Sequence, residues 1–121
     1  MTLPATINLP DSVKSQVPAK FLWVDQTDQN WPPELMETRH LFYSLRMIWN
    51  HRMPEEAKLH PYKRYDLRRS DKYLSEAILA LTKEIATRKD LADEWRADLS
   101  HMINWLSTHQ LESTHDKLPT R

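Results

Sequence analysis

Apolar side chains recur every three to four positions along two long stretches of the sequence, which is the spacing of one helix face. Between residues 70 and 88 the repeating positions are Leu74, Ala77, Ile78, Leu81 and Ile85. Between residues 90 and 109 they are Leu91, Trp95, Leu99, Met102 and Leu106. Because strictly alternating apolar and polar runs are short, we expect an all-α protein.

A third helix is predicted over residues 33–52, because proline is accepted in the first turn of a helix and Pro54 stops it. One further short helical piece fits residues 55–59. Residues 33–112 are therefore expected to form a small helical bundle of three main helices plus a short helix.

Capping residues set the expected starts of the second and third long helices. The side chain of Asp66 or Ser70 can accept a hydrogen bond from the first backbone N–H groups of the helix that ends near residue 88. Asp90 can cap the last helix in the same way. Only Lys89 and Asp90 then separate the two helices, so we expect them to form an antiparallel hairpin.

Residues 1–32 differ in composition from the rest, because five of the eight prolines lie in the first 33 residues. Proline fixes φ and restricts the preceding residue, so a proline-rich N-terminal arm is predicted, with room for one or two helical turns at Asp11–Val17. The apolar Phe21–Val24 segment is expected to pack on the bundle, and its length is that of a short strand. Residues 113–121 form a polar C-terminal tail.

The chain of 121 residues contains no glycine and no cysteine. Ordinary usage of about 7% predicts roughly eight glycines. Phosphate-binding loops need glycine for tight turns and for close approach of the backbone to the phosphate. The absence of glycine therefore argues against the Walker A, dinucleotide-binding and kinase loops. The lack of cysteine excludes disulfides, thiolate zinc sites and cysteine nucleophiles.

Basic and acidic residues balance, with 17 Lys plus Arg against 17 Asp plus Glu. A sequence-independent DNA coater is normally basic, and this chain is not. The longest apolar runs, Phe21–Val24 and Ala77–Leu81, are far shorter than the ~20 residues that cross a bilayer. The N-terminus also lacks the pattern of a secretory signal, so we expect a cytoplasmic protein with no membrane association.

The helix predicted at 33–52 has a second apolar stripe, formed by Met36, Tyr43 and Met47. A helix that is apolar on two sides is either covered on both or offers one side to a partner. The Phe21–Val24 segment or the short helix could cover the stripe. Otherwise the three residues are the candidate partner-binding site, for a protein partner or a second copy of the chain.

Residues 58–72 are rich in basic side chains with tyrosines between them. Arginine binds phosphate bidentately and tyrosine rings can stack on unpaired bases, so this segment is the candidate nucleic-acid contact. The alternative is a solvated loop whose arginines pair with nearby acids. The residues concerned are Lys58, Lys63, Arg64, Tyr65, Arg68, Arg69 and Lys72.

Two carboxylate–histidine pairs have helical spacing, Glu37 with His40 and Asp98 with His101. In four-helix di-metal proteins such pairs face further glutamates, and the N-terminal arm here supplies none. We therefore predict no metal and no cofactor.

Arg46 and His51, like Arg96 and His101, match the Arg-x4-His spacing of helical ribonucleases of the HEPN class. With nine arginines and six histidines about one such match is expected by chance, so no catalytic residue is assigned from it.

The sequence favours a non-catalytic small intracellular protein that binds a macromolecular partner, as an adaptor, an inhibitor or an assembly subunit. The alternative is a nucleic-acid-binding protein that uses residues 58–72. A metal-dependent or HEPN-like helical hydrolase is a distant third possibility.

Overall fold

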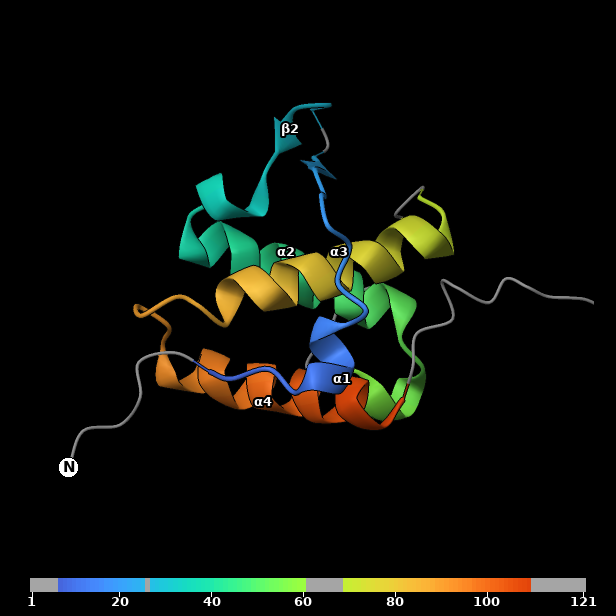
Figure 1. Cartoon of the computed structure of the whole chain (residues 1–121), viewed down its shortest axis with the longest axis vertical. Coiled ribbons are helices and arrows are strands. Elements are labelled where there is room, and N and C mark those ends of the chain that lie inside the picture. The colour runs from blue at the N-terminus through green and yellow to red at the C-terminus, as the bar shows by residue number, and fades with distance from the viewer. Residues whose placement is uncertain (1–6, 26, 61–68, 110–121) are drawn as a thin grey trace, which may run out of the picture.

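The computed structural model describes residues 7–25, 27–60 and 69–109, and the chain is mostly helical (Figure 1). A two-stranded sheet accompanies the helices, with Trp23 opposite Trp31 in antiparallel register. The α-helices are α1 (Asp11–Lys14), α2 (Thr38–Arg52), α3 (Asp71–Ile85) and α4 (Asp93–Thr108). The remaining elements are strands β1 (Trp23–Val24) and β2 (Asn30–Trp31) and the 3-10 turns η1 (Pro33–Leu35) and η2 (Glu55–Ala57). The predicted tail at 113–121 lies outside the described residues.

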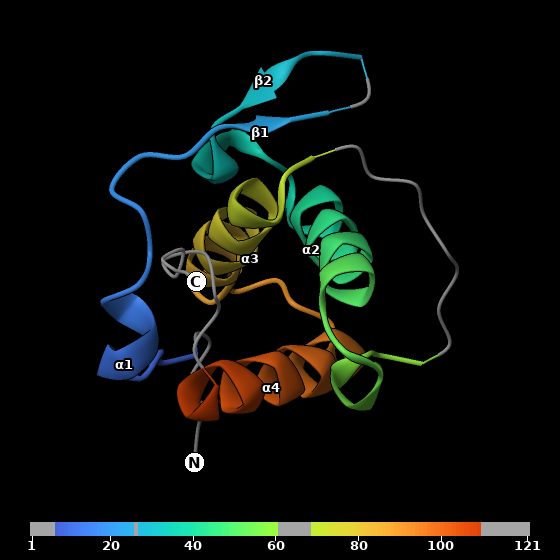
Figure 2. The same ribbon diagram turned by 90° about the vertical axis from the view of Figure 1, so that its right-hand side faces the viewer.

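Helices α2 and α3 form an antiparallel pair at the centre of the molecule (Figure 2). At one end, Arg52 of α2 donates through Nε to the Ser75 hydroxyl of α3, at 3.1 Å. At the other end, Arg88 beyond α3 donates through Nη1 to the Thr38 hydroxyl, at 3.2 Å. These contacts fix the direction and the register of the pair.

Helix α4 crosses the pair at an angle, on the side away from the sheet (Figure 2). Its Trp95 ring stacks on Phe42, with ring centroids 4.8 Å apart. One turn further along both helices, Asp98 lies 3.8 Å from Arg46. α4 therefore runs in the same general direction as α2. The last two long helices are therefore antiparallel, as predicted (Figure 1), but residues 86–92 connect them instead of Lys89 and Asp90 alone, and α3 packs chiefly against α2.

Two predicted helix starts are wrong. The first long helix begins at Thr38 and not at Pro33, because Met36 and Glu37 are extended and separate it from the η1 turn. The last one begins at Asp93 with Ala92 as its cap. Asp90 instead accepts a hydrogen bond from the Thr38 hydroxyl, at 2.7 Å. Ser70 does cap α3, accepting from the Tyr73 N–H at 3.1 Å.

The N-terminal segment, residues 7–25, runs along the side of α3 from α4 up to the sheet (Figures 1 and 2). Its Leu9, Val13 and Trp23 side chains belong to the same buried cluster as the long helices. Near the sheet, the Tyr73 hydroxyl of α3 donates to the Leu22 carbonyl at 2.8 Å and accepts from the Val24 N–H at 3.0 Å. One side chain thus fixes two backbone groups of this segment to α3.

A buried amide fixes the chain that follows η2. Asn50 of α2 is 4% exposed. Its Oδ1 accepts from the Leu59 N–H at 2.7 Å and its Nδ2 donates to the Leu59 carbonyl at 3.1 Å. The Asn50 amide thus pairs both the N–H and the carbonyl of Leu59, as a neighbouring strand would. The buried backbone at Leu59 therefore has no unpaired N–H group.

In the part of the chain that the structure describes, no helix has both the length and the apolar character needed to cross a bilayer.

Replacing Asn50 with Ala leaves the buried Leu59 N–H without an acceptor. We expect the free energy of unfolding to fall by about 2 kcal/mol. Denaturant unfolding followed by circular dichroism measures the change. The matched control is Asn104→Ala, since Asn104 is exposed on α4. An equal effect of the two substitutions would show that the Asn50 amide contributes nothing specific.

Replacing Tyr73 with Phe removes the hydroxyl that holds Leu22 and Val24. We expect a loss of about 1–2 kcal/mol in the free energy of unfolding. Tyr43→Phe is the control and leaves stability within about 0.5 kcal/mol, because the Tyr43 side chain is half exposed.

The same tyrosine makes stability sensitive to high pH. Burial raises the pKa of Tyr73 above its ordinary value of 10.0. The neutral phenol is therefore favoured in the folded protein, and its contribution is complete below pH 10 and is lost as the pH rises through the raised pKa. Unfolding measured at pH 8 and at successive values above 10 is expected to show a decline that Tyr73→Phe lacks.

Candidate interaction surface

The outer side of α2 carries the candidate surface, which we call the α2 face and define by Arg39, His40, Tyr43, Ser44 and Met47. Tyr43 is 50% exposed and Met47 is partly buried against the core. Both had been predicted for partner binding. Met36, predicted with them, is only 2% exposed and precedes the helix in an extended conformation. Met36 is therefore a core residue and not part of an exposed stripe.

Three neighbours hold the Tyr43 ring in place. Phe42 and Trp95 meet it edge to face, with centroids 5.5 and 5.6 Å away. The Arg39 guanidinium lies 5.8 Å from the ring centroid, within the range of a cation–π contact. A large aromatic side chain is thus presented to solvent in a fixed orientation, at low entropic cost for docking.

Two shallow hollows lie on either side of Ser44 and Met47. The first, about 260 Å³, is bounded by Tyr43, Arg46 and Asn50 in addition to these two. The second, about 310 Å³, lies between α2 and the sheet, where Trp23, Asp25, Thr27 and His40 complete its wall. The N-terminal segment therefore covers part of this side of α2, which agrees with the prediction that the Phe21–Val24 segment could cover the apolar stripe. Tyr43 stays exposed to solvent.

The wall formed by the sheet is organised by one carboxylate. Asp25 accepts from the Trp31 Nε1–H at 2.8 Å and from the Thr27 hydroxyl at 2.7 Å. It also accepts from the Thr27 and Gln29 N–H groups at 2.8 and 3.0 Å. These hydrogen bonds hold the pKa of Asp25 far below its usual 3.8, and the bond from the Trp31 indole makes the largest contribution. The tight turn they enclose places Asp28 at φ 65°, a left-handed conformation that aspartate tolerates better than most residues.

Charge is distributed unevenly around the α2 face. Helix α2 contains three arginines and two histidines and no acidic residue. Arg46 lies 3.8 Å from Asp98, but no ion pair joins Arg39 to another described residue. The first turn of the neighbouring α4 is acidic, with Asp93 and Glu94 exposed. The aromatic contact between Tyr43 and Trp95 therefore has a basic helix on one side and an acidic helix start on the other.

The basic segment 58–72 is only partly described, since Lys63, Arg64, Tyr65 and Arg68 lie outside the described residues. The basic residues that are described contact the protein itself. Lys58 lies 3.7 Å from Glu55, and Lys72 lies 2.6 Å from Glu76. Arg69 donates to the Val24 carbonyl at 3.0 Å.

In the structure, both histidines of the carboxylate–histidine pairs that sequence spacing suggested contact other groups. His40 contacts the edge of Trp31, and His101 lies 3.0 Å from the Ala57 carbonyl across the molecule. Asp98 lies beside Arg46. Within the described ranges, no group of three or more histidines and carboxylates could hold a metal ion.

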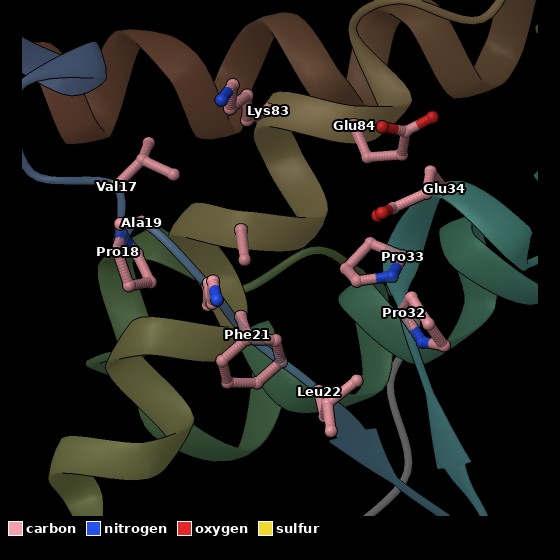
Figure 3. Close-up of a pocket in the computed structure, with 12 residues that line it drawn as sticks. Val17, Pro18, Ala19, Phe21, Leu22, Pro32, Pro33, Glu34, Lys83 and Glu84 are labelled. Carbon is pink, nitrogen blue, oxygen red and sulfur yellow. The ribbon is translucent and has the colours of Figure 1, made fainter.

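A larger groove lies on the opposite side of the α2–α3 pair, and sequence analysis did not predict it (Figure 3). It has a volume of about 460 Å³ and lies between the N-terminal segment, η1 and α3. Phe21, Leu22 and three prolines form its apolar walls, with Lys20, Lys83, Glu34 and Glu84 around them. Its walls come from three separate parts of the chain, so no local sequence pattern could indicate it.

Comparison with protein-family models, with curated proteins and with solved structures finds no match to this chain.

Lowering the pH is expected to weaken the sheet that borders the α2 face. The pKa of Asp25 is lower in the folded than in the unfolded chain, so its contribution is present above pH 3.8 and is lost as the pH falls below that value. Asp25→Asn is destabilised relative to wild type at pH 7, and the difference shrinks below pH 3.8. Unfolding curves followed by tryptophan fluorescence test this. Asp28→Asn, in the same turn, is the control, and a similar pH-dependent difference there would contradict the assignment.

Proposed function

We propose that this chain is a non-catalytic protein that binds a macromolecular protein partner through the α2 face, as an adaptor, an inhibitor or an assembly subunit. The single observation that supports this most strongly is the half-exposed Tyr43, held between Phe42, Trp95 and Arg39. Tyrosine, tryptophan and arginine are enriched at the energetic centres of protein interfaces, and methionine is more frequent at interfaces than on the rest of the surface. Its expected cytoplasmic location stays a prediction.

The shape of the surface agrees with a protein ligand. A docking side chain can enter either hollow beside Met47, while the exposed ring of Tyr43 covers apolar surface next to it. Methionine adapts to partners of different shape because it is unbranched and polarisable. The polar, partly exposed His40 beside the second hollow can form hydrogen bonds with a partner's backbone.

The described residues favour a protein partner over nucleic acid. A nucleic-acid site needs arginine or lysine groups that are available to phosphates. Lys58, Arg69 and Lys72 are instead engaged with Glu55, Val24 and Glu76. The Tyr73 hydroxyl is likewise used to hold the N-terminal segment. Nucleic-acid binding is therefore kept as an alternative, which the nuclease treatment in the pull-down below distinguishes from protein binding.

Replacing Met47 with Glu places a charge between the two hollows. We expect the variant to fold and to lose its partner in pull-downs from lysates of the cells that express the chain. The loss is at least tenfold, because a buried unpaired carboxylate at an interface costs more than about 1.4 kcal/mol. Circular dichroism and thermal unfolding establish that the variant is folded.

The matched control is Leu22→Glu, which introduces the same charge at a 47% exposed leucine in the groove on the other side. It is expected to retain the partner. Nuclease treatment of parallel lysates separates proteins held directly from those bridged by nucleic acid. Retention by Met47→Glu, or loss of all captured material after nuclease, would contradict the proposal.

A further inference from the structure

We propose that the partner seated on the α2 face is a second copy of this chain, joined by a twofold axis that passes beside Tyr43. This inference rests on the proposed function, since it names the occupant of the same surface. Three observations carry it: the adjacent opposite charges, the fixed aromatic pair and the zero net charge of the chain.

The charges beside the aromatic pair are self-complementary. Arg39 is exposed on α2 and has no ion-pair partner among the described residues, while Glu94 is exposed on α4 next to Trp95. Glu94 lies one turn before Asp98, which contacts Arg46, so Glu94 lies on the side of α4 that faces α2. A surface with a cation on one side of its centre and an anion on the other can pair with its own twofold image. Arg39 of each copy then faces Glu94 of the other.

The aromatic pair supplies the apolar centre that such an interface needs. On the axis, the exposed ring of Tyr43 packs against its counterpart in the second copy. Trp95 is partly exposed beside it, and its stacking on Phe42 prevents it from reorienting. Because these rings are already ordered in one copy, little side-chain entropy is lost when the second copy docks.

Whole-molecule electrostatics do not oppose the association of two copies. Lys plus Arg and Asp plus Glu are equal in number, so the formal net charge is zero at neutral pH. Proteins with a large net charge repel their own copies, and this chain lacks that repulsion. An acidic protein partner would suit α2 alone, but it would meet Asp93 and Glu94 of α4 at the same surface. A second copy offers an acidic helix start to α2 and a basic helix to α4, so its charges complement both helices.

Sedimentation velocity on the purified full chain, from about 1 µM to about 1 mM, tests the proposal directly. Wild type is expected to shift from monomer to dimer within this range. Arg39→Glu and Glu94→Arg each convert two symmetric attractions into repulsions, and each is expected to weaken self-association about tenfold. Lys83→Glu, a charge reversal in the groove on the other side, leaves it unchanged.

Mixing the two charge variants provides the decisive measurement. In the mixed dimer, Glu at position 39 faces Arg at position 94, and the native Glu94 faces the native Arg39. Both contacts are attractive again, so the mixture of Arg39→Glu and Glu94→Arg is expected to form dimers at wild-type concentrations. Labelling one variant with a fluorophore shows that the dimers contain both chains.

Wild type that stays monomeric up to about 1 mM, or dimers that form equally well with either charge variant alone, would overturn the inference. Monomeric wild type that still captures a protein through Met47 would leave the proposed function standing with a different partner. A wild-type dimer that Met47→Glu and Tyr43→Ala leave intact would also overturn the inference, because the two copies would then meet through another surface; the pull-down with Met47→Glu decides the proposed function separately.

Discussion

The burial of α3 is the constraint on which the rest of the structure depends. Its Leu74, Ile78, Leu81 and Ile85 side chains are fully buried, and Leu79 and Ala80 on its other side are buried as well. A helix that is apolar nearly all round needs cover on every side. Helix α2 covers one side and the N-terminal segment runs along another, so the segment is part of the core and not an appendage. The positions of α4 and the sheet follow from this arrangement.

Single polar side chains position the connections on this apolar centre. Asn50 holds Leu59, Tyr73 holds Leu22 and Val24, and Asp25 closes the turn between β1 and β2. Each of these side chains forms hydrogen bonds with backbone groups of a connecting segment or of the short strand β1, so the chain is fixed without long stretches of regular structure. The absence of glycine fits this design, because the one left-handed residue in the described chain is Asp28.

The α2 face follows from the incomplete cover that the N-terminal segment gives to α2. The sheet encloses the second hollow together with His40, Ser44 and Met47, and Tyr43 lies outside this hollow and is half exposed. Trp95 then approaches from α4 and fixes the tyrosine without covering it. The same arrangement brings an acid-free helix beside an acidic helix start. Partner binding and self-association are both proposed from this one surface, because it combines ordered aromatic rings with opposite charges.

The sequence by itself determined the helical class, since the apolar spacing of residues 70–88 and 90–109 is that of helix faces and α3 and α4 occupy those stretches. It also indicated the short helical turns near Asp11 and Glu55, and it offered Ser70 beside Asp66 as the cap that the structure shows at Ser70. Only the tertiary structure decided that Met36 is buried while Tyr43 is exposed, and that Asp90 bonds to Thr38 and does not cap a helix. The physical reason is that local spacing fixes which side of a helix is apolar. Which segment covers that side depends on contacts between residues about 50 positions apart, such as Tyr73 with Leu22 and Trp95 with Phe42.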